Sequence, residues 1–161
     1  DYYKNPDFYP DLHEQDTSRQ LVWLDSVLSA STEKQKIVVG HHPVYSVGEH
    51  GSEPDMKRVF EPRFEKYGVD LYVAGHDHSL QSLHRQGSAL SHLISGGGSE
   101  QTHVKIDPSI TRFAKASAGF MLVAMRPKAL KIYFINSAGK VIYSETISNE
   151  VVQGSRHLTD K

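Results

Sequence analysis

Two short apolar segments of this sequence each end at a glycine followed by a histidine, and this repeated arrangement limits the possible folds more than any other feature. Residues 37–40 read Ile-Val-Val-Gly and lead into His41, and residues 69–74 lead into Gly75 and His76. Short apolar runs of this kind are typical of strands buried in a parallel sheet. Because ligand sites in α/β sheets lie at the carboxyl ends of strands, the segments predict histidines gathered at one sheet edge.

Each of these segments follows a helical pattern. Residues 17–20 have the form of a capping box, and the helix that follows is expected to end near Ser31. A second apolar helical face covers about residues 54–67, where Pro62 should kink or split the helix and Gly68 should end it. The alternation of helix and strand predicts an α/β fold.

The last third of the sequence has a different pattern. After a triple glycine at 96–98 we expect a loop to about Ala118. Three β-rich runs separated by short turns then follow, at residues 120–125, 130–136 and 141–147. This spacing predicts an antiparallel meander.

The composition narrows the possible chemistry. The 161 residues (18.0 kDa) are 38% hydrophobic and 23% charged, which fits one folded domain. Eighteen basic and nineteen acidic side chains give a net charge of −1 without a basic cluster, so neither a nucleic acid nor a membrane partner is expected. The absence of cysteine excludes disulfides, thiol catalysis and cysteine-bound zinc, whereas ten histidines are unusually many.

The segment 75–78, Gly-His-Asp-His, is the strongest candidate for a metal site. A His-x-His pair in extended chain points two imidazoles the same way, and the preceding glycine lets the backbone turn close to an ion. Imidazole nitrogens suit borderline transition metals. Gly40 likewise precedes His41, so the candidate metal ligands at the sheet edge are His41, His76 and His78.

The other histidines have a plainer interpretation as surface or hydrogen-bonded residues. It covers His42, which Pro43 should hold in an extended conformation, and the following five: His13, His84, His92, His103 and His157. For Asp77 a structural role and a direct role are equally favoured. The triple glycine is not a phosphate-binding P-loop, because no Lys-Ser/Thr and no helix pattern follow it, and we interpret it as a turn bordering the site.

Four motifs at this spacing resemble the metallophosphoesterases of the purple (tartrate-resistant) acid phosphatase type, in the calcineurin-like superfamily. The motifs are Gly40-His41-His42-Pro43-Val44-Tyr45-Ser46, Glu49-His50-Gly51, Tyr67-Gly68-Val69-Asp70-Leu71-Tyr72 and Gly75-His76-Asp77-His78. Gly-His-x-Pro and Gly-His-Asp-His are each moderately specific, and together with Glu-His-Gly between them they form a strong signature. The resemblance extends from about Thr17 to Ser99 and weakens beyond it.

The resemblance implies a role for each histidine. In this family two metal ions, iron with iron, zinc or manganese, share one site. His41 and His76 would bind the divalent ion, and His78 the second, usually ferric, ion. His50 would face the substrate, where it contacts phosphate or protonates the leaving oxygen. Such sites hydrolyse phosphate monoesters with a metal-activated hydroxide.

The family's bridging aspartate and its other upstream ligands precede the region that matches Thr17, and this sequence does not contain them. We therefore expect residues 1–150 to be the C-terminal part of a calcineurin-like phosphoesterase domain, with residues 151–161 as a polar tail. The expected fold is the C-terminal half of an α/β metallophosphoesterase β-sandwich flanked by helices, with a mixed sheet and the antiparallel meander. We also expect this chain alone to show negligible phosphatase activity and weak binding of divalent metal.

Two alternatives remain open. A phosphodiesterase or nucleotide hydrolase would use the same two-metal site, and a non-catalytic scaffold module would keep the fold without the chemistry. The presence of His41, His50, His76 and His78 together favours the enzyme. By resemblance, the substrate would be a phosphorylated small molecule or a phosphoprotein, and the protein would be secreted or periplasmic.

Overall fold

The structure is a computed structural model that describes residues 17–148. The predicted irregular start, residues 1–16, and the predicted tail, residues 151–161, lie outside the described part. The chain divides into two compact units, Asp1–Glu33 and Lys34–Lys161, which are described separately.

The described part of the first unit is the helix α1, Thr17–Ala30. It begins at the predicted capping box and ends one residue before the predicted Ser31, whose N–H donates to the carbonyl of Val27 at 3.1 Å. Leu21, Leu24 and Leu28 share one face because they are three and four residues apart. Neither α1 nor any other described helix has the length and apolar character needed to cross a membrane.

The second unit contains a five-stranded sheet with the order β1-β2-β4-β3-β5. Strands β1, β2 and β4 run parallel, as predicted for the first two, and β3 runs antiparallel to both β4 and β5. The strands are β1 (Ile37–Val39), β2 (Leu71–Ala74), β3 (Leu80–His84), β4 (Ser91–Ser95) and β5 (Thr111–Lys115).

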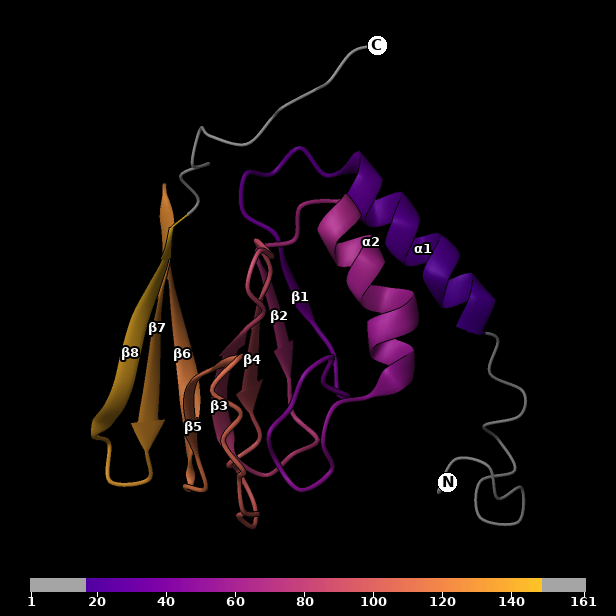
Figure 1. The fold of residues 1–161 in the computed structure, drawn as a ribbon. Helices are drawn as coiled ribbons and strands as arrows, with labels where there is room; N and C mark the ends of the chain where they lie inside the picture. Colours follow the sequence, from indigo (N-terminus) through magenta and orange to yellow (C-terminus); the bar gives the residue numbers. More distant parts are fainter. Residues whose placement is uncertain (1–16, 149–161) are drawn as a thin grey trace, which may run out of the picture. The chain divides into compact units, whose positions relative to one another are not determined.

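The predicted meander forms a separate three-stranded antiparallel sheet, shown in Figure 1. It consists of β6 (Gly119–Arg126), β7 (Ala129–Asn136) and β8 (Val141–Ser148). Gly139, in the turn between β7 and β8, has a φ of 74°, which glycine adopts more readily than other residues. The meander prediction is therefore confirmed.

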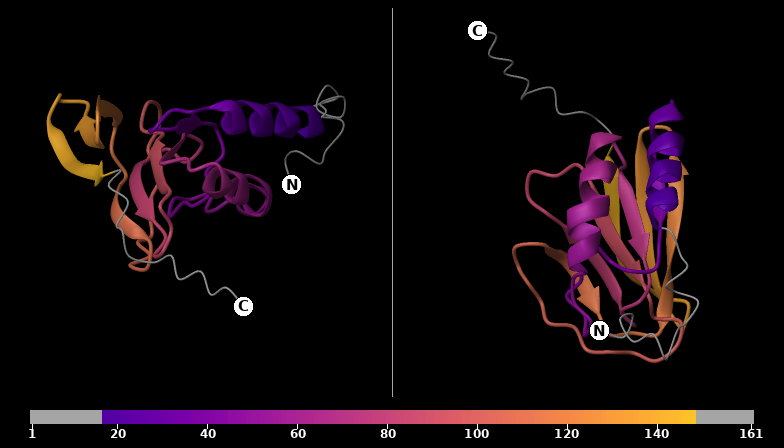
Figure 2. Two further views of the ribbon diagram at one scale, coloured as in Figure 1. Left: turned by 90° about the horizontal axis from the view of Figure 1, so that it is seen from above. Right: turned by 90° about the vertical axis from the view of Figure 1, so that its right-hand side faces the viewer.

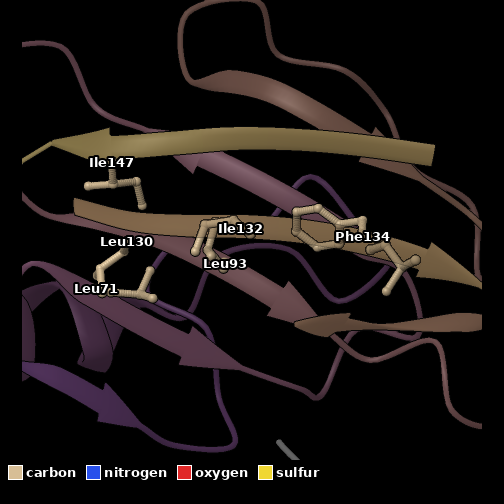
Figure 3. Packing of buried hydrophobic residues seen from close by; sticks show 7 residues of the cluster. Leu71, Leu93, Leu130, Ile132, Phe134 and Ile147 are labelled. Carbon is tan, nitrogen blue, oxygen red and sulfur yellow. The ribbon is translucent and has the colours of Figure 1, made fainter. Parts of the chain in front are cut away.

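The two sheets pack face to face and enclose the hydrophobic core. Figure 3 shows Leu71 and Leu93 of the five-stranded sheet beside side chains of the meander. The buried cluster comprises Leu71, Leu80, Leu93, Leu130, Ile132, Phe134 and Ile147. This core holds β2 and β4, and thereby fixes the positions at which the strands end.

A helix covers the opposite face of the five-stranded sheet (Figures 1 and 2). It contains a π-helical segment, η3 (Met56–Phe60), and continues as α2 (Glu61–Lys66). Pro62 lacks an N–H, so the helical hydrogen-bond pattern changes where the sequence predicted a kink. Phe64 stacks on Tyr72 of β2 with ring centroids 5.0 Å apart. Gly68, with a φ of 64°, follows the helix as predicted.

Some strands differ from the prediction. β3 and β4 were not predicted, and β5 lies within the segment expected to be a loop. Strand β1 was expected to be covered on both faces, but it is an edge strand of the described sheet and Val39 is 73% exposed. The unpredicted β3 and β4 contain fully buried polar side chains, such as Gln81 and Ser82, so they lack the apolar run that marks a buried strand.

Candidate metal centre

The carboxyl ends of β1 and β2 bring the two Gly-His turns together. Beyond the paired residues, the N–H of Gly40 donates to the carbonyl of Val73 at 3.0 Å. The N–H of Gly75 in turn donates to the carbonyl of His41 at 3.1 Å. These bonds extend the parallel ladder past the strands, so the predicted edge carries both His41 and His76.

Three imidazoles gather around the imidazole of His76. Its Nδ1 lies 3.1 Å from Nε2 of His41. Its ring centroid lies 4.5 Å from that of His42 and 4.6 Å from that of His50. One nitrogen from each of His41, His42 and His76 lies within 4.8 Å of the other two. Because neutral imidazoles bind transition metals, this set of donor atoms fits a metal ion.

His76 has an unusual backbone conformation. Its φ is 48°, which makes it the one non-glycine residue in the left-handed region among residues 17–148. A non-glycine residue held there costs on the order of 1–3 kcal/mol, and such strain clusters at functional sites. The prediction that the His-x-His segment is extended is therefore wrong, and the direction of each ring depends on this turn rather than on strand alternation.

Burial and the neighbouring imidazoles both lower the pKa of histidines in this cluster. Burial lowers the pKa of His76, and the positive forms of His42, His50 and His41 lower it further, whereas Asp77 opposes the shift. Burial and His41 likewise lower the pKa of His42, against the opposing charge of Glu53. Both rings therefore favour the neutral form, which is the form that binds a metal.

Asp77 is a structural anchor of the site. Its side chain is fully buried, and its Oδ1 accepts a hydrogen bond from the backbone N–H of His50 at 2.8 Å. Its Oδ2 accepts a hydrogen bond from the hydroxyl of Ser46. A Cβ at Gly48 would lie 2.5 Å from Cγ of Asp77, so only glycine fits against this carboxylate. Asp77 thus joins the loop that carries His50 to the turn that carries His76.

Gln81 also links the loop that carries His50 to the sheet, and the sequence analysis did not predict this role. Its Oε1 accepts a hydrogen bond from the N–H of Val47 at 2.9 Å. Its Nε2 donates to the hydroxyls of Ser46 at 3.1 Å and Ser79 at 2.8 Å. A polar residue in a short strand carries no distinctive sequence signal, because its importance comes from complete burial against a distant loop.

His78 lies differently from the other predicted ligands. Its Nδ1 lies 3.3 Å from Oε1 of Glu100, and its backbone carbonyl accepts a hydrogen bond from Thr102 at 3.0 Å. It does not belong to the group formed by His41, His42 and His76 among the described residues. A carboxylate beside one ring nitrogen leaves Nε2 as the nitrogen suited to a metal. Its assignment to a second ion stays a prediction.

His42 lies within the cluster, although the sequence favoured a plain structural interpretation for it. Its carbonyl accepts a hydrogen bond from the hydroxyl of Tyr72 at 2.7 Å. Burial raises the pKa of Tyr72 to about 12, so this hydroxyl remains a donor. A Cβ at Gly40 would lie 2.3 Å from the same hydroxyl. The packing of Tyr72 thus fixes the backbone beneath the His42 ring.

A partly buried polar network centres on the carboxylate of Glu61. The hydroxyl of Tyr45 donates to Glu61 at 3.1 Å, and Nε of Arg85 donates to the same carboxylate at 3.3 Å. The ring of His92 lies 4.9 Å from that of Tyr45. Burial lowers the pKa of His92 to about 3, so its ring is neutral near pH 7. Its ring is buried, and neither ring nitrogen has a hydrogen-bond partner in the described part of the chain, so the expectation of a surface or hydrogen-bonded histidine is wrong here.

Comparisons with known proteins show which family and which relatives this chain is similar to. The family model described as calcineurin-like phosphoesterase matches residues 2–80. Purple acid phosphatase 17 of Arabidopsis thaliana is 32% identical over 137 residues, which cover 82% of this chain and 40% of the relative. Human tartrate-resistant acid phosphatase type 5 is 32% identical over 133 residues, covering 77% and 41%. The chain thus spans about two fifths of the length of these relatives.

Two solved structures share the fold. GAP50, the anchor in the inner membrane complex of Plasmodium, superposes with a TM-score of 0.74 and 23% identity, covering 91% of this chain and 46% of that one. A purple acid phosphatase from yellow lupin seeds superposes with a TM-score of 0.70 and 19% identity, covering 92% and 29%. At these identities the superpositions bear on the fold alone.

Proposed function

Because this chain belongs to the calcineurin-like phosphoesterase family, with purple acid phosphatases among its relatives, we propose that it supplies part of a site that hydrolyses phosphate monoesters. The observation that carries the proposal is the contact between His41 and His76, whose facing nitrogens lie 3.1 Å apart at the ends of neighbouring parallel strands. Few structural roles require two imidazoles in such a position, whereas a metal-dependent hydrolase does.

In the proposed site His41 and His76 hold the divalent ion, and His78 contributes to a second ion. A bound metal pair supplies positive charge that neutralises the phosphate and lowers the pKa of water. Iron with iron, zinc or manganese is the proposed pair, by family resemblance.

His50 is the proposed general acid. Its ring contacts that of His76 at 4.6 Å between centroids, and Asp77 fixes its backbone. In this position a protonated imidazole can give its proton to the leaving oxygen of the substrate, a step that positioned histidines commonly catalyse. Asp77 and Gln81 act by positioning, because both hold the loop around His50 and neither belongs to the imidazole cluster.

The proposed activity requires more residues than this chain contributes. The relatives match over about two fifths of their length, and the family's bridging carboxylate precedes the matched helix. We therefore propose that turnover requires the upstream half of the site. The proposed substrates are phosphorylated small molecules or phosphoproteins, and the proposed location is secreted or periplasmic.

The substrate class can be tested with a protein that includes the upstream half. We expect kcat/KM for p-nitrophenyl phosphate to exceed that for bis-p-nitrophenyl phosphate by at least about tenfold, which corresponds to about 1.4 kcal/mol of transition-state binding. The 161-residue chain assayed alongside should show negligible turnover. Preference for the diester would instead support a phosphodiesterase, and robust turnover by this chain alone would contradict the requirement for upstream residues.

A non-catalytic scaffold is the second candidate. GAP50, the anchor in the inner membrane complex of Plasmodium, shares this fold over 91% of the chain, but at 23% identity that likeness bears on the fold alone. The strained conformation of His76 and the three imidazoles in contact with it argue for an enzyme, because a scaffold gains nothing from them. If the protein with its upstream half hydrolyses neither substrate in the presence of added metal, the scaffold becomes the better explanation.

A further inference from the structure

We propose that His42 is a metal ligand and that His41, His42 and His76 together form a three-nitrogen site for one divalent transition-metal ion such as zinc. His42 occupies the variable position of the Gly-His-x-Pro motif, so the family resemblance gives it no role. The inference rests on the proposed function only in using the same pair, His41 and His76.

The separations between the ring nitrogens support this site. Tetrahedral zinc has Zn–N bonds of about 2.0–2.1 Å, which places neighbouring ligand nitrogens about 3.3–3.4 Å apart. The 3.1 Å between Nε2 of His41 and Nδ1 of His76 is close to that value. One nitrogen of each of the three residues lies within 4.8 Å of the other two, which makes His42 the third donor beside this pair.

The backbone holds these three residues in place before any ion binds. The hydroxyl of Tyr72 holds the carbonyl of His42 at 2.7 Å, and the N–H of Gly75 holds the carbonyl of His41 at 3.1 Å. His76 keeps its left-handed conformation in the adjacent turn. The fold therefore already orders the backbone of the three ligands, which lowers the entropic cost of binding.

The donor set indicates which metals should bind. Three imidazole nitrogens select zinc, copper or nickel over magnesium or calcium, which prefer oxygen ligands. His41 is exposed and the other two are partly exposed, so an ion can enter from solvent. Three histidines around zinc leave a fourth position for water or substrate. The expectation of weak metal binding took no account of His42.

Calorimetric titration of the 161-residue chain with Zn²⁺ tests the inference without any phosphatase assay. We expect one ion per chain, and we expect His42→Ala to weaken binding at least about tenfold. Titration with Co²⁺ should give the intense visible absorption of a four-coordinate site, and His42→Ala should diminish it. His103→Ala, a change at an exposed histidine outside the cluster, is the matched control and should bind as the unmodified chain does.

Folding of each variant is checked by circular dichroism, and His42→Asn serves as a second variant of similar polarity. If both His42 variants are folded and bind Zn²⁺ as tightly as the unmodified chain, the inference is overturned. It is also overturned if the unmodified chain binds no Zn²⁺. Neither result decides the proposed function, which depends on turnover by the protein with its upstream half.

Discussion

Replacing His76 with alanine, in the protein that includes the upstream half of the site, should reduce kcat/KM for p-nitrophenyl phosphate by at least about a thousandfold. His76 is the residue around which the rings of His41, His42 and His50 gather. Its removal deletes a proposed metal ligand and a ring that His50 contacts. Loss of a residue that merely orients a ligand costs about 10–100-fold, so loss of the ligand itself should exceed that range.

His76→Asn is the variant that separates chemistry from folding. Asparagine tolerates the left-handed conformation better than alanine, so it should preserve the turn while removing the imidazole. His103→Ala should retain full activity. If His76→Asn is folded and keeps more than about a tenth of the activity, His76 orients other groups and is not a metal ligand.

Gly96→Ala should destabilise the protein by about 3 kcal/mol, because added atoms in a tightly packed region force backbone shifts. A Cβ at Gly96 would lie 1.9 Å from the backbone oxygen of Asp77 and 3.4 Å from that of Gly75. Both atoms belong to the turn that carries His76, and backbone cannot rotate away as a side chain can. Urea unfolding measures the loss of stability.

Gly98→Ala is the matched control two residues away. A Cβ there has no atom within 4 Å, and Gly98 is not among the glycines with positive φ. The substitution should change the free energy of unfolding by less than about 1 kcal/mol, with stabilisation as the expected sign. Equal stability of the two variants would show that the close approach of Gly96 to Asp77 does not constrain the turn.

The sequence predicted the elements that have strong local patterns. Both helices, the two parallel strands and the meander have regular apolar spacing, and the structure confirms them. Strands β3 and β4 escaped prediction because they bury polar side chains and so lack the apolar run that marks a buried strand. Gln81, for example, bonds to Val47 and Ser46 across more than thirty positions.

The site was predictable in its location and less so in its details. The Gly-His turns placed His41 and His76 at one edge correctly, because parallel strands end together. The direction of the His76 ring depends on the left-handed φ of this residue, which the alternation of side chains along a strand does not predict. The sequence favours a structural role for His42, because any one histidine in a chain with ten is more often structural than a metal ligand. Only three-dimensional contact with His76 distinguishes it.

The proposed phosphatase activity depends on imidazoles at the strand ends that hold catalytic metal. The most direct measurement is the activity of the protein with its upstream half on p-nitrophenyl phosphate, before and after a chelator removes metal and after iron, zinc or manganese is restored. We expect the rate to fall at least about a hundredfold and to recover with added metal, since the metals supply the nucleophile and the charge. Full activity in protein shown by elemental analysis to contain no metal would contradict the account.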